Sequence, residues 1–213
     1  MDDGLTPGML LRAYGAGIFP MAESRDDPAL HWIDPKHRGV IPLREFHISR
    51  SLRKAIRSDK YQARFDTDFA GVVQACADRS NTWINATIQD LYLELFKMGR
   101  AHSQEIWDDS GLIGGVYGVV LGGAFFGESM FSRRENSSKI ALAWLVDRLR
   151  LCGFELFDTQ FLTDHLVTLG GREISRKEYH RQLAVAMDIR ADINNPGLVQ
   201  TAQDVIQRNT QTS

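Results

Sequence analysis

The sequence contains little that would direct the chain into a membrane or an oxidising compartment. Its two cysteines, Cys76 and Cys152, lie far apart and belong to no CxxC or Cys/His spacing, so we expect both to be free thiols. The acidic start, MDDG, is not the basic leader of a signal segment. The longest uncharged run, residues 111–127, is shorter than the roughly 20 residues of a spanning helix and is interrupted by glycines. These absences predict a cytoplasmic protein with no membrane partner.

The chain also lacks the spacings that are typical of metal and nucleotide sites. Its six histidines form no HExxH pattern or paired-ligand spacing, which predicts no metal site. The glycine run at 114–123 lies inside expected strands and not between a strand and a helix, so it predicts close strand packing and no nucleotide loop. Ser129 is not part of a GxSxG elbow and is not expected to be a nucleophile. The sequence therefore predicts no cofactor.

Positive charge is concentrated in one segment. The formal net charge is -2, yet residues 36–64 contain nine Lys or Arg against two acids, an excess of +7 that leaves -9 for the remainder. Four of these cations fall within about 100° of arc on an expected helix: Arg50, Arg53, Lys54 and Arg57. Such a face on an acidic body fits a polyanion partner, although a solvated charged face is the plainer explanation.

The apolar pattern predicts an α+β fold. Helices are expected near residues 5–14, 50–57, 69–77, 85–98, 139–151 and 176–187, and strands at 103–107, 112–121, 124–131 and 154–160. The proline-rich stretch 18–42 is expected to be irregular. We expect a small N-terminal domain, residues 1–34, and a larger domain, 35–213, with a mixed, mostly antiparallel sheet flanked by helices. Residues 189–213 are expected to form a loosely held tail.

Polar side chains stand out in two of the expected strands. Asp158 and Gln160 are two residues apart, so they share one face of a strand whose apolar start indicates a buried face. A strand that enters a site explains this pair, and so do helix capping or solvent exposure. Glu128 interrupts an apolar strand, and its carboxylate requires a partner, such as a nearby arginine.

Several blocks, in order and spacing, resemble the bacterial leucyl/phenylalanyl-tRNA-protein transferases. Together they span residues 13–170, most of the chain: AYGAGIFP at 13–20, Trp32, Pro35, HISRS at 47–51, TWI at 82–84, GRAHSQE at 99–105, GGVYG at 114–118, GESMFS at 127–132, DTQ at 158–160, HL at 165–166 and LG at 169–170. Two features depart from the family pattern. The chain begins close to the first block, and Met21 stands where many members have tryptophan.

The resemblance implies a small N-terminal domain on an acetyltransferase-like (GNAT-type) domain that works without metal or coenzyme A. It also implies an activity: transfer of leucine or phenylalanine, and less well methionine, from aminoacyl-tRNA to acceptor proteins with N-terminal Arg or Lys. The product would be degraded by the N-end rule pathway, and the enzyme is expected to be a monomer.

The resemblance further assigns roles to individual residues. Gln160, oriented by Asp158, would help to take the proton from the acceptor amine, and Glu128 would line the aminoacyl site and hold an ammonium group. Tyr14 and Trp83 would stack on the terminal adenosine. The amino-acid side chain would occupy a pocket whose walls are Val116, Phe125, Met130 and Leu145.

Two other functions remain as alternatives. An acyl-CoA-dependent N-acetyltransferase would share the fold, but the loop at 132–138 has no glycine and one acid, which disfavours a coenzyme A pyrophosphate. A non-catalytic RNA-binding module could use the cationic helix, but it would not need Asp158 and Gln160 in a pocket.

Overall fold

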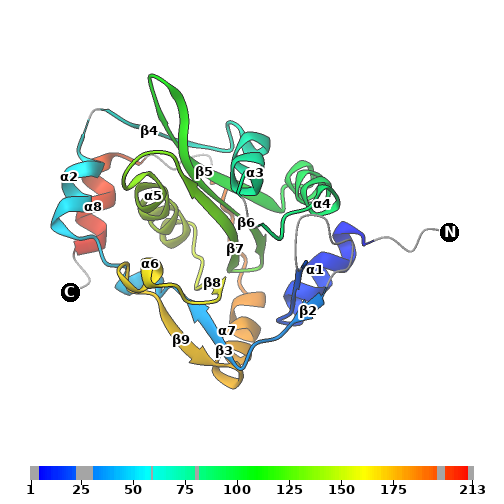
Figure 1. Cartoon of the computed structure of the whole chain (residues 1–213). Coiled ribbons are helices and arrows are strands. Elements are labelled where there is room, and N and C mark those ends of the chain that lie inside the picture. Colours follow the sequence, from blue (N-terminus) through cyan, green and yellow to red (C-terminus); the bar gives the residue numbers. More distant parts are fainter. Residues whose placement is uncertain (1–4, 23–30, 59, 80–81, 196–199, 211–213) are drawn as a thin grey trace.

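The computed structural model describes residues 5–22, 31–58, 60–79, 82–195 and 200–210, and it has α+β architecture (Figure 1). The helices are α1 (Pro7–Gly15), α2 (Arg50–Ile56), α3 (Phe69–Ala77), α4 (Ala86–Lys97), α5 (Ser137–Leu151), α6 (Asp164–Val167), α7 (Arg176–Met187) and α8 (Ala202–Thr210). The strands are β1 (Phe19–Met21), β2 (His31–Ile33), β3 (His37–Val40), β4 (Gln62–Phe65), β5 (Ala101–Asp108), β6 (Gly111–Leu121), β7 (Ala124–Ser132), β8 (Leu156–Gln160) and β9 (Arg172–Ser175). Within these residues no helix combines the length and apolarity needed to cross a membrane.

A mixed sheet of seven strands forms the centre of the molecule, in the order β4-β5-β6-β7-β8-β3-β9. Its neighbours are antiparallel except β7 and β8, which run parallel and are joined through α5. This confirms the α+β prediction and the mostly antiparallel sheet. The expected helices 69–77 and 176–187 match α3 and α7 residue for residue, and the meander of three strands is β5-β6-β7.

Two apolar cores lie on opposite faces of the sheet. One contains Tyr14, Phe69, Tyr92 and Phe126, with side chains from α1, α3, α4 and α7. The other contains Val116 and Phe125, with side chains from α2, α5 and α8. Figure 1 shows α5 and α8 on one side of the sheet and α1, α3 and α4 on the other. The parallel strands β7 and β8 run between the two layers, so their side chains can reach both cores.

The stretch 18–42 is not irregular where it is described. β1 pairs with β2 in a small antiparallel sheet, and β3 enters the main sheet between β8 and β9. Two features of the sequence hid these strands. The stretch is rich in proline, which predicts irregular chain, and each strand has only three or four residues, too few to show an alternating pattern. The proposed domain boundary at residue 34/35 stays a prediction.

The expectation of a loose tail from residue 189 is wrong for the described part of that segment. Helix α8 buries Val205 and Ile206 against the core next to α5 and α2. Arg208 also donates from Nε and Nη2 to the buried carboxylate of Asp147, at 2.6 and 2.7 Å. Two apolar residues and one ion pair hold this helix, although most of its residues are polar.

Candidate active site

A buried ion pair joins strand β3 to the end of strand β8. Arg38 of β3 donates from Nε to Asp158 Oδ1 at 2.9 Å and from Nη2 to Oδ2 at 2.6 Å, and both side chains are at most 1% exposed. Tyr179 of α7 donates to Asp158 Oδ2 at 2.8 Å. Burial lowers the pKa of Arg38, but the hydrogen bonds and charge of Asp158 outweigh this effect and raise it overall. The arginine and the tyrosine therefore hold both oxygens of Asp158 in a fixed position.

Gln160 ends β8 in a left-handed backbone conformation with φ of 62°. The backbone N–H of Gln160 donates to Asp158 Oδ1 at 2.8 Å, so the carboxylate stabilises the turn of the chain at this residue. β3 supports this turn at Gly39, where a Cβ atom would lie 2.6 Å from the carbonyl carbon of Phe161. Gln160 is thus a polar side chain at 8% exposure whose backbone is set by Asp158.

Glu128 lies at a β-bulge in β7. Tyr117 pairs with Ser129 and Gly118 pairs with Gly127, which leaves Glu128 as the extra residue without a Cα partner. The bulge changes the alternation of the strand: Phe126 belongs to the core with Tyr14, whereas Met130 packs against the opposite core. A carboxylate at such an irregularity can be aimed into a site without breaking the ladder on either side.

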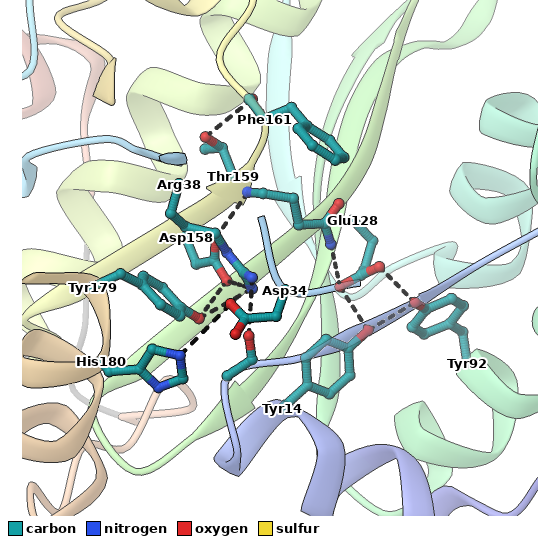
Figure 2. Close-up of polar contacts among 12 residues, drawn as sticks. Tyr14, Asp34, Arg38, Tyr92, Glu128, Asp158, Thr159, Phe161, Tyr179 and His180 are labelled. Atoms are coloured by element: carbon teal, nitrogen blue, oxygen red, sulfur yellow. Dashed lines mark hydrogen bonds and ion pairs between the residues drawn. The ribbon is translucent and has the colours of Figure 1, made fainter. Parts of the chain in front are cut away.

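The carboxylate of Glu128 accepts hydrogen bonds from three elements (Figure 2). Tyr14 of α1 donates to Oε1 at 2.7 Å, Gln160 donates from Nε2 to Oε1 at 3.1 Å, and Tyr92 of α4 donates to Oε2 at 2.5 Å. Burial raises the pKa of Glu128 to about 7, while these three hydrogen bonds act in the opposite direction. Burial also raises the pKa of both tyrosines, so they remain protonated donors. Within the described part of the chain these hydrogen bonds come from two tyrosines and a glutamine, so the alternative of an internal salt bridge to an arginine is not supported.

A cavity of about 240 Å³ opens beside Glu128 between the two layers. Its apolar wall comes from β6, β7, β8, α5 and α6: Val116, Met130, Leu142, Phe157, Phe161 and Leu166. Glu128, Thr159 and Thr163 provide polar atoms, and Trp83 and Arg79 also line the cavity. A mainly apolar hollow with one convergent acid is the usual form of a site for an uncharged side chain with a polar backbone.

The expected pocket wall requires a correction. Val116 and Met130 line the cavity, but Phe125 and Leu145 do not, because both are at most 1% exposed in the core behind it. Phe125 packs edge to face against Phe157, which takes the lining position. Leu145 lies one turn after Leu142 on the same side of α5, so helical periodicity identifies the face but not the turn that reaches the cavity.

The aromatic side chains that were expected to stack on the terminal adenosine, Tyr14 and Trp83, also differ from the expectation. The Tyr14 ring is fully buried and tilted against Phe126, with centroids 4.8 Å apart, so it offers no face to a base. Trp83 is half-buried and lines the cavity. Phe161, which follows Gln160, lines the same cavity with 43% of its surface exposed. Trp83 and Phe161 are therefore the aromatic side chains available at this opening.

Three network residues escaped the sequence reasoning: Arg38, Tyr92 and Tyr179. Each is separated by more than twenty positions from the carboxylate it bonds, and each lies in a pattern that also suits an ordinary core or surface residue. The sequence did indicate that donors must exist, because a buried Asp158 carboxylate needs hydrogen-bond donors. Sequence spacing could not identify which donors the fold would provide.

The cationic helix α2 begins after Ser49, whose side chain accepts from the amide of Leu52 at 3.2 Å. Leu52 and Ile56 are buried, as expected for the apolar side. Arg50, Lys54 and Arg57 are exposed, and Arg53 is half-buried with its Nε bonded to the carbonyl of Ile48. No acidic partner of these four side chains is found within the described ranges. The face therefore presents unneutralised charge, at the edge of the molecule farthest from α1 in Figure 1.

If this face binds the tRNA that the sequence resemblance implies, reversing two of its charges should weaken that binding. The variant Arg50→Glu/Lys54→Glu would then remove two phosphate contacts, so log affinity should depend less steeply on log salt, by about 1 unit of slope for each contact. Filter binding across a salt series measures this effect. The control reverses Lys97 and Arg100, two exposed cations at the end of α4. Unchanged affinity and slope in the first variant, or an equal loss in the control, would place the tRNA elsewhere.

Comparison with known proteins gives one family over nearly the whole chain. The family model described as leucyl/phenylalanyl-tRNA protein transferase matches residues 40–184, and the model of that family's N-terminal domain matches residues 3–36. The proteins named leucyl/phenylalanyl-tRNA--protein transferase of Cereibacter sphaeroides (strain ATCC 17029 / ATH 2.4.9) and Ruegeria sp. (strain TM1040) are 59% and 60% identical over 209 residues. The match covers 98% of this chain and 98% and 99% of theirs. The structure of FemX matches with a TM-score of 0.49 and 9% identity over 73% of this chain and 60% of that chain.

Proposed function

Because this chain belongs to the leucyl/phenylalanyl-tRNA protein transferase family, whose members are aminoacyltransferases, we propose that it transfers leucine or phenylalanine, and less well methionine, from aminoacyl-tRNA to the N-terminal Arg or Lys of acceptor proteins. The product would be marked for N-end rule degradation, and the enzyme would act as a cytoplasmic monomer. One observation carries the proposal: an apolar cavity ends at a buried carboxylate that is bonded to the Asp158–Gln160 turn.

The reaction requires a neutral amine and a stabilised tetrahedral intermediate. The acceptor nitrogen forms a bond to the ester carbonyl carbon, the bond from that carbon to the ribose oxygen breaks, and the ribose hydroxyl leaves with a proton. The acceptor begins as an α-ammonium group with a pKa of about 8. An enzyme therefore has to remove a proton and align the two substrates, and it needs no covalent intermediate.

The hydrogen bonds separate the roles of the two acids. Asp158 already accepts four hydrogen bonds, two on each oxygen, from Arg38, Tyr179 and the amide of Gln160. It has no free lone pair for a substrate proton, so we assign it as a positioning residue. Glu128 accepts two hydrogen bonds on Oε1 and one on Oε2, and it lines the cavity. Glu128 Oε2 can take one more, and we assign it as the proton acceptor.

Gln160 connects these two acids. Its Nε2 donates to Glu128, which leaves its side-chain oxygen free to accept from the acceptor amine. An amide oxygen is far too weak a base to keep a proton, so Gln160 orients the amine and Glu128 receives the proton. This division modifies the expectation that Gln160 itself takes the proton. The donor's side chain would fill the apolar cavity, with its adenine against Trp83 or Phe161.

Selectivity among donors is expected to be modest for apolar side chains and strict against charge. One methylene in an apolar pocket changes binding by only about 1 to 3 kcal/mol, and the thioether of Met130 adapts to different shapes. Replacing Leu142 by alanine should enlarge the cavity and favour phenylalanine over leucine by several-fold. Competition between the two charged tRNAs measures this ratio, and Leu145→Ala, behind the wall, is the matched control. Efficient transfer of aspartate or lysine would contradict the assignment.

The direct test is incubation with radiolabelled leucyl-tRNA and peptides that differ only in an N-terminal Arg, Lys or Glu. Label is expected in the first two peptides and not in the third. An acyl-CoA-dependent N-acetyltransferase would instead bind acetyl-CoA in calorimetry and label peptides from it. A non-catalytic RNA-binding module would bind the tRNA without transfer.

A further inference from the structure

A second cavity, of about 520 Å³, adjoins the aminoacyl cavity and shares Arg79 and Met130 with it. The rest of its lining comes from the end of α3, the end of β7, the start of α5 and α6: Ala75, Asp78, Phe131, Ser132, Arg133, Ser138 and His165. Arg79 donates from Nη2 to the carbonyl of Met130, so its guanidinium is held at the junction. None of these residues has a role in the network around Glu128.

The start of α5 points hydrogen-bond donors toward this cavity. The helix has 15 residues and no acid in its first turn, and its N-cap residue, Asn136, makes no side-chain capping bond. The amide of Ser138 has only a long contact, 3.5 Å, to Ser132 Oγ. Ser138, at 6% exposure, lines the cavity, and so does His165, whose buried Nε2 has no partner among the described residues. A hydroxyl and a weakly bonded amide at a helix N-terminus are donors suited to an anion.

The charges around the cavity favour an anion as well. Arg133 is exposed, but its Nη1 donates to the carbonyl of Leu112, which fixes the guanidinium at the rim. His165 has a buried Nε2 without a partner. Asp78 is the one acid in the lining, against Arg79 and Arg133. The cavity is thus cationic at its rim and rich in donors at the α5 N-terminus.

We propose that this second cavity binds a phosphodiester of the donor tRNA, the one that precedes the terminal adenosine. The proposal rests on the proposed function, which places that adenosine at Trp83 or Phe161, and on the shared wall, because the next phosphate must lie within one nucleotide of the adenosine. Ser138 and Arg133 would hold two of its oxygens. The contact would fix the ester carbonyl against Glu128 without reading the sequence of the tRNA.

The test compares two short donors, phenylalanyl-adenosine and phenylalanyl-CpA, which differ by one nucleotide and its phosphodiester. Arg133→Gln and Ser138→Ala are expected to lower kcat/KM for phenylalanyl-CpA by about tenfold or more, the effect of one charge-assisted hydrogen bond, and to leave phenylalanyl-adenosine within about twofold. The matched control is Arg134→Gln, since Arg134 faces Asp108 at 3.8 Å and does not line this cavity. It should leave both donors unchanged.

Equal losses with both donors, or no loss with either, would overturn the proposal. If the wild-type protein transferred from neither donor, the proposed function would fail, and calorimetry with uncharged CpA would still test the site. If CpA binds the wild-type protein and binds the Arg133→Gln variant more weakly, the phosphodiester site is supported. Binding of coenzyme A that weakens in the same variant, with no binding of CpA, would assign the cavity to a coenzyme pyrophosphate and overturn it.

Discussion

Replacing Glu128 by glutamine is expected to lower single-turnover transfer by about 10²-fold or more, the usual contribution of a general base. Glutamine has nearly the same shape and can still bond Tyr14 and Tyr92, but it cannot take the proton. Affinity for aminoacyl-tRNA should stay within a few-fold, because the apolar cavity and the cationic helix are unchanged. Rapid-quench transfer at saturating enzyme, with filter binding in parallel, separates the two quantities.

The dependence on pH gives a sharper signature. Burial raises the pKa of Glu128 to about 7, so its ionised, proton-accepting form increases as pH rises through 7. The wild-type rate should therefore rise through this range, with a further rise near pH 8 as the acceptor amine becomes neutral. Glu128→Gln should lose the limb near 7 and keep the limb near 8. Hydrolysis of the tRNA ester without enzyme is subtracted at each pH.

Tyr92→Phe provides the matched control for this assignment. It removes the hydrogen bond to Glu128 Oε2, which favours the ionised form, and leaves the carboxylate in place. The limb near pH 7 should then move upward by about 1 to 2 units, since a hydrogen bond to a charged group contributes about 1.5 to 3 kcal/mol and one pKa unit is 1.36 kcal/mol. A limb that stays in place, or a normal rate in Glu128→Gln, would remove Glu128 from proton transfer.

The stability of the protein should vary with pH in the opposite sense. The pKa of Glu128 is higher in the folded state than the ordinary value of 4.5, so the folded state binds a proton there more tightly than the unfolded chain. The corresponding contribution is fully present below about 4.5 and is lost as pH rises through about 7. Glu128→Gln should remove this loss. The same residue would then decrease stability at the pH at which it becomes an active base.

The sequence was sufficient for the larger elements and insufficient for the details of the site. Helix α3 and the meander could be predicted because apolar periodicity repeats over many residues. The bulge at Glu128 could not, because one extra residue in β7 has no local sequence signature, and it sends Phe126 and Met130 to opposite cores. The side chain of Tyr14 lies beside Glu128, yet burial makes it a donor to that carboxylate and leaves it no face for stacking.

Non-local pairing explains the remaining failures. Arg38 lies in a strand too short to recognise, and its partner Asp158 is 120 residues away. Helix α8 looked like a solvated tail because its anchors are two adjacent apolar residues and an ion pair to Asp147 in α5. For the buried acid, the need for donors followed from its place in an apolar strand. The residue that meets the requirement is set by the tertiary fold.

Asp158→Asn is expected to reduce transfer by about 10²-fold or more, but by a different route and with a cost in stability. Asparagine has one acceptor oxygen in place of two, and it leaves the guanidinium of Arg38 buried without a counter-charge. Breaking a buried ion pair on one side typically costs about 3 to 5 kcal/mol of unfolding free energy. Denaturant unfolding and rapid-quench transfer should therefore both show losses, and the single variant does not distinguish folding from catalysis.

The double variant Arg38→Met/Asp158→Leu separates them. Two apolar residues of similar volume remove both buried charges, so part of the unfolding free energy lost in Asp158→Asn should return, although the Tyr179 hydroxyl and the Gln160 backbone amide are left without their acceptor. Transfer should stay low, because the amide of Gln160 has lost its acceptor and the turn no longer holds the Gln160 side chain against Glu128. Adding Gln160→Ala should then reduce transfer little further, since residues that act as a unit are not additive. Recovery of transfer together with stability would show that Asp158 serves the fold alone, and a full additional loss from Gln160→Ala would show that the two residues act independently.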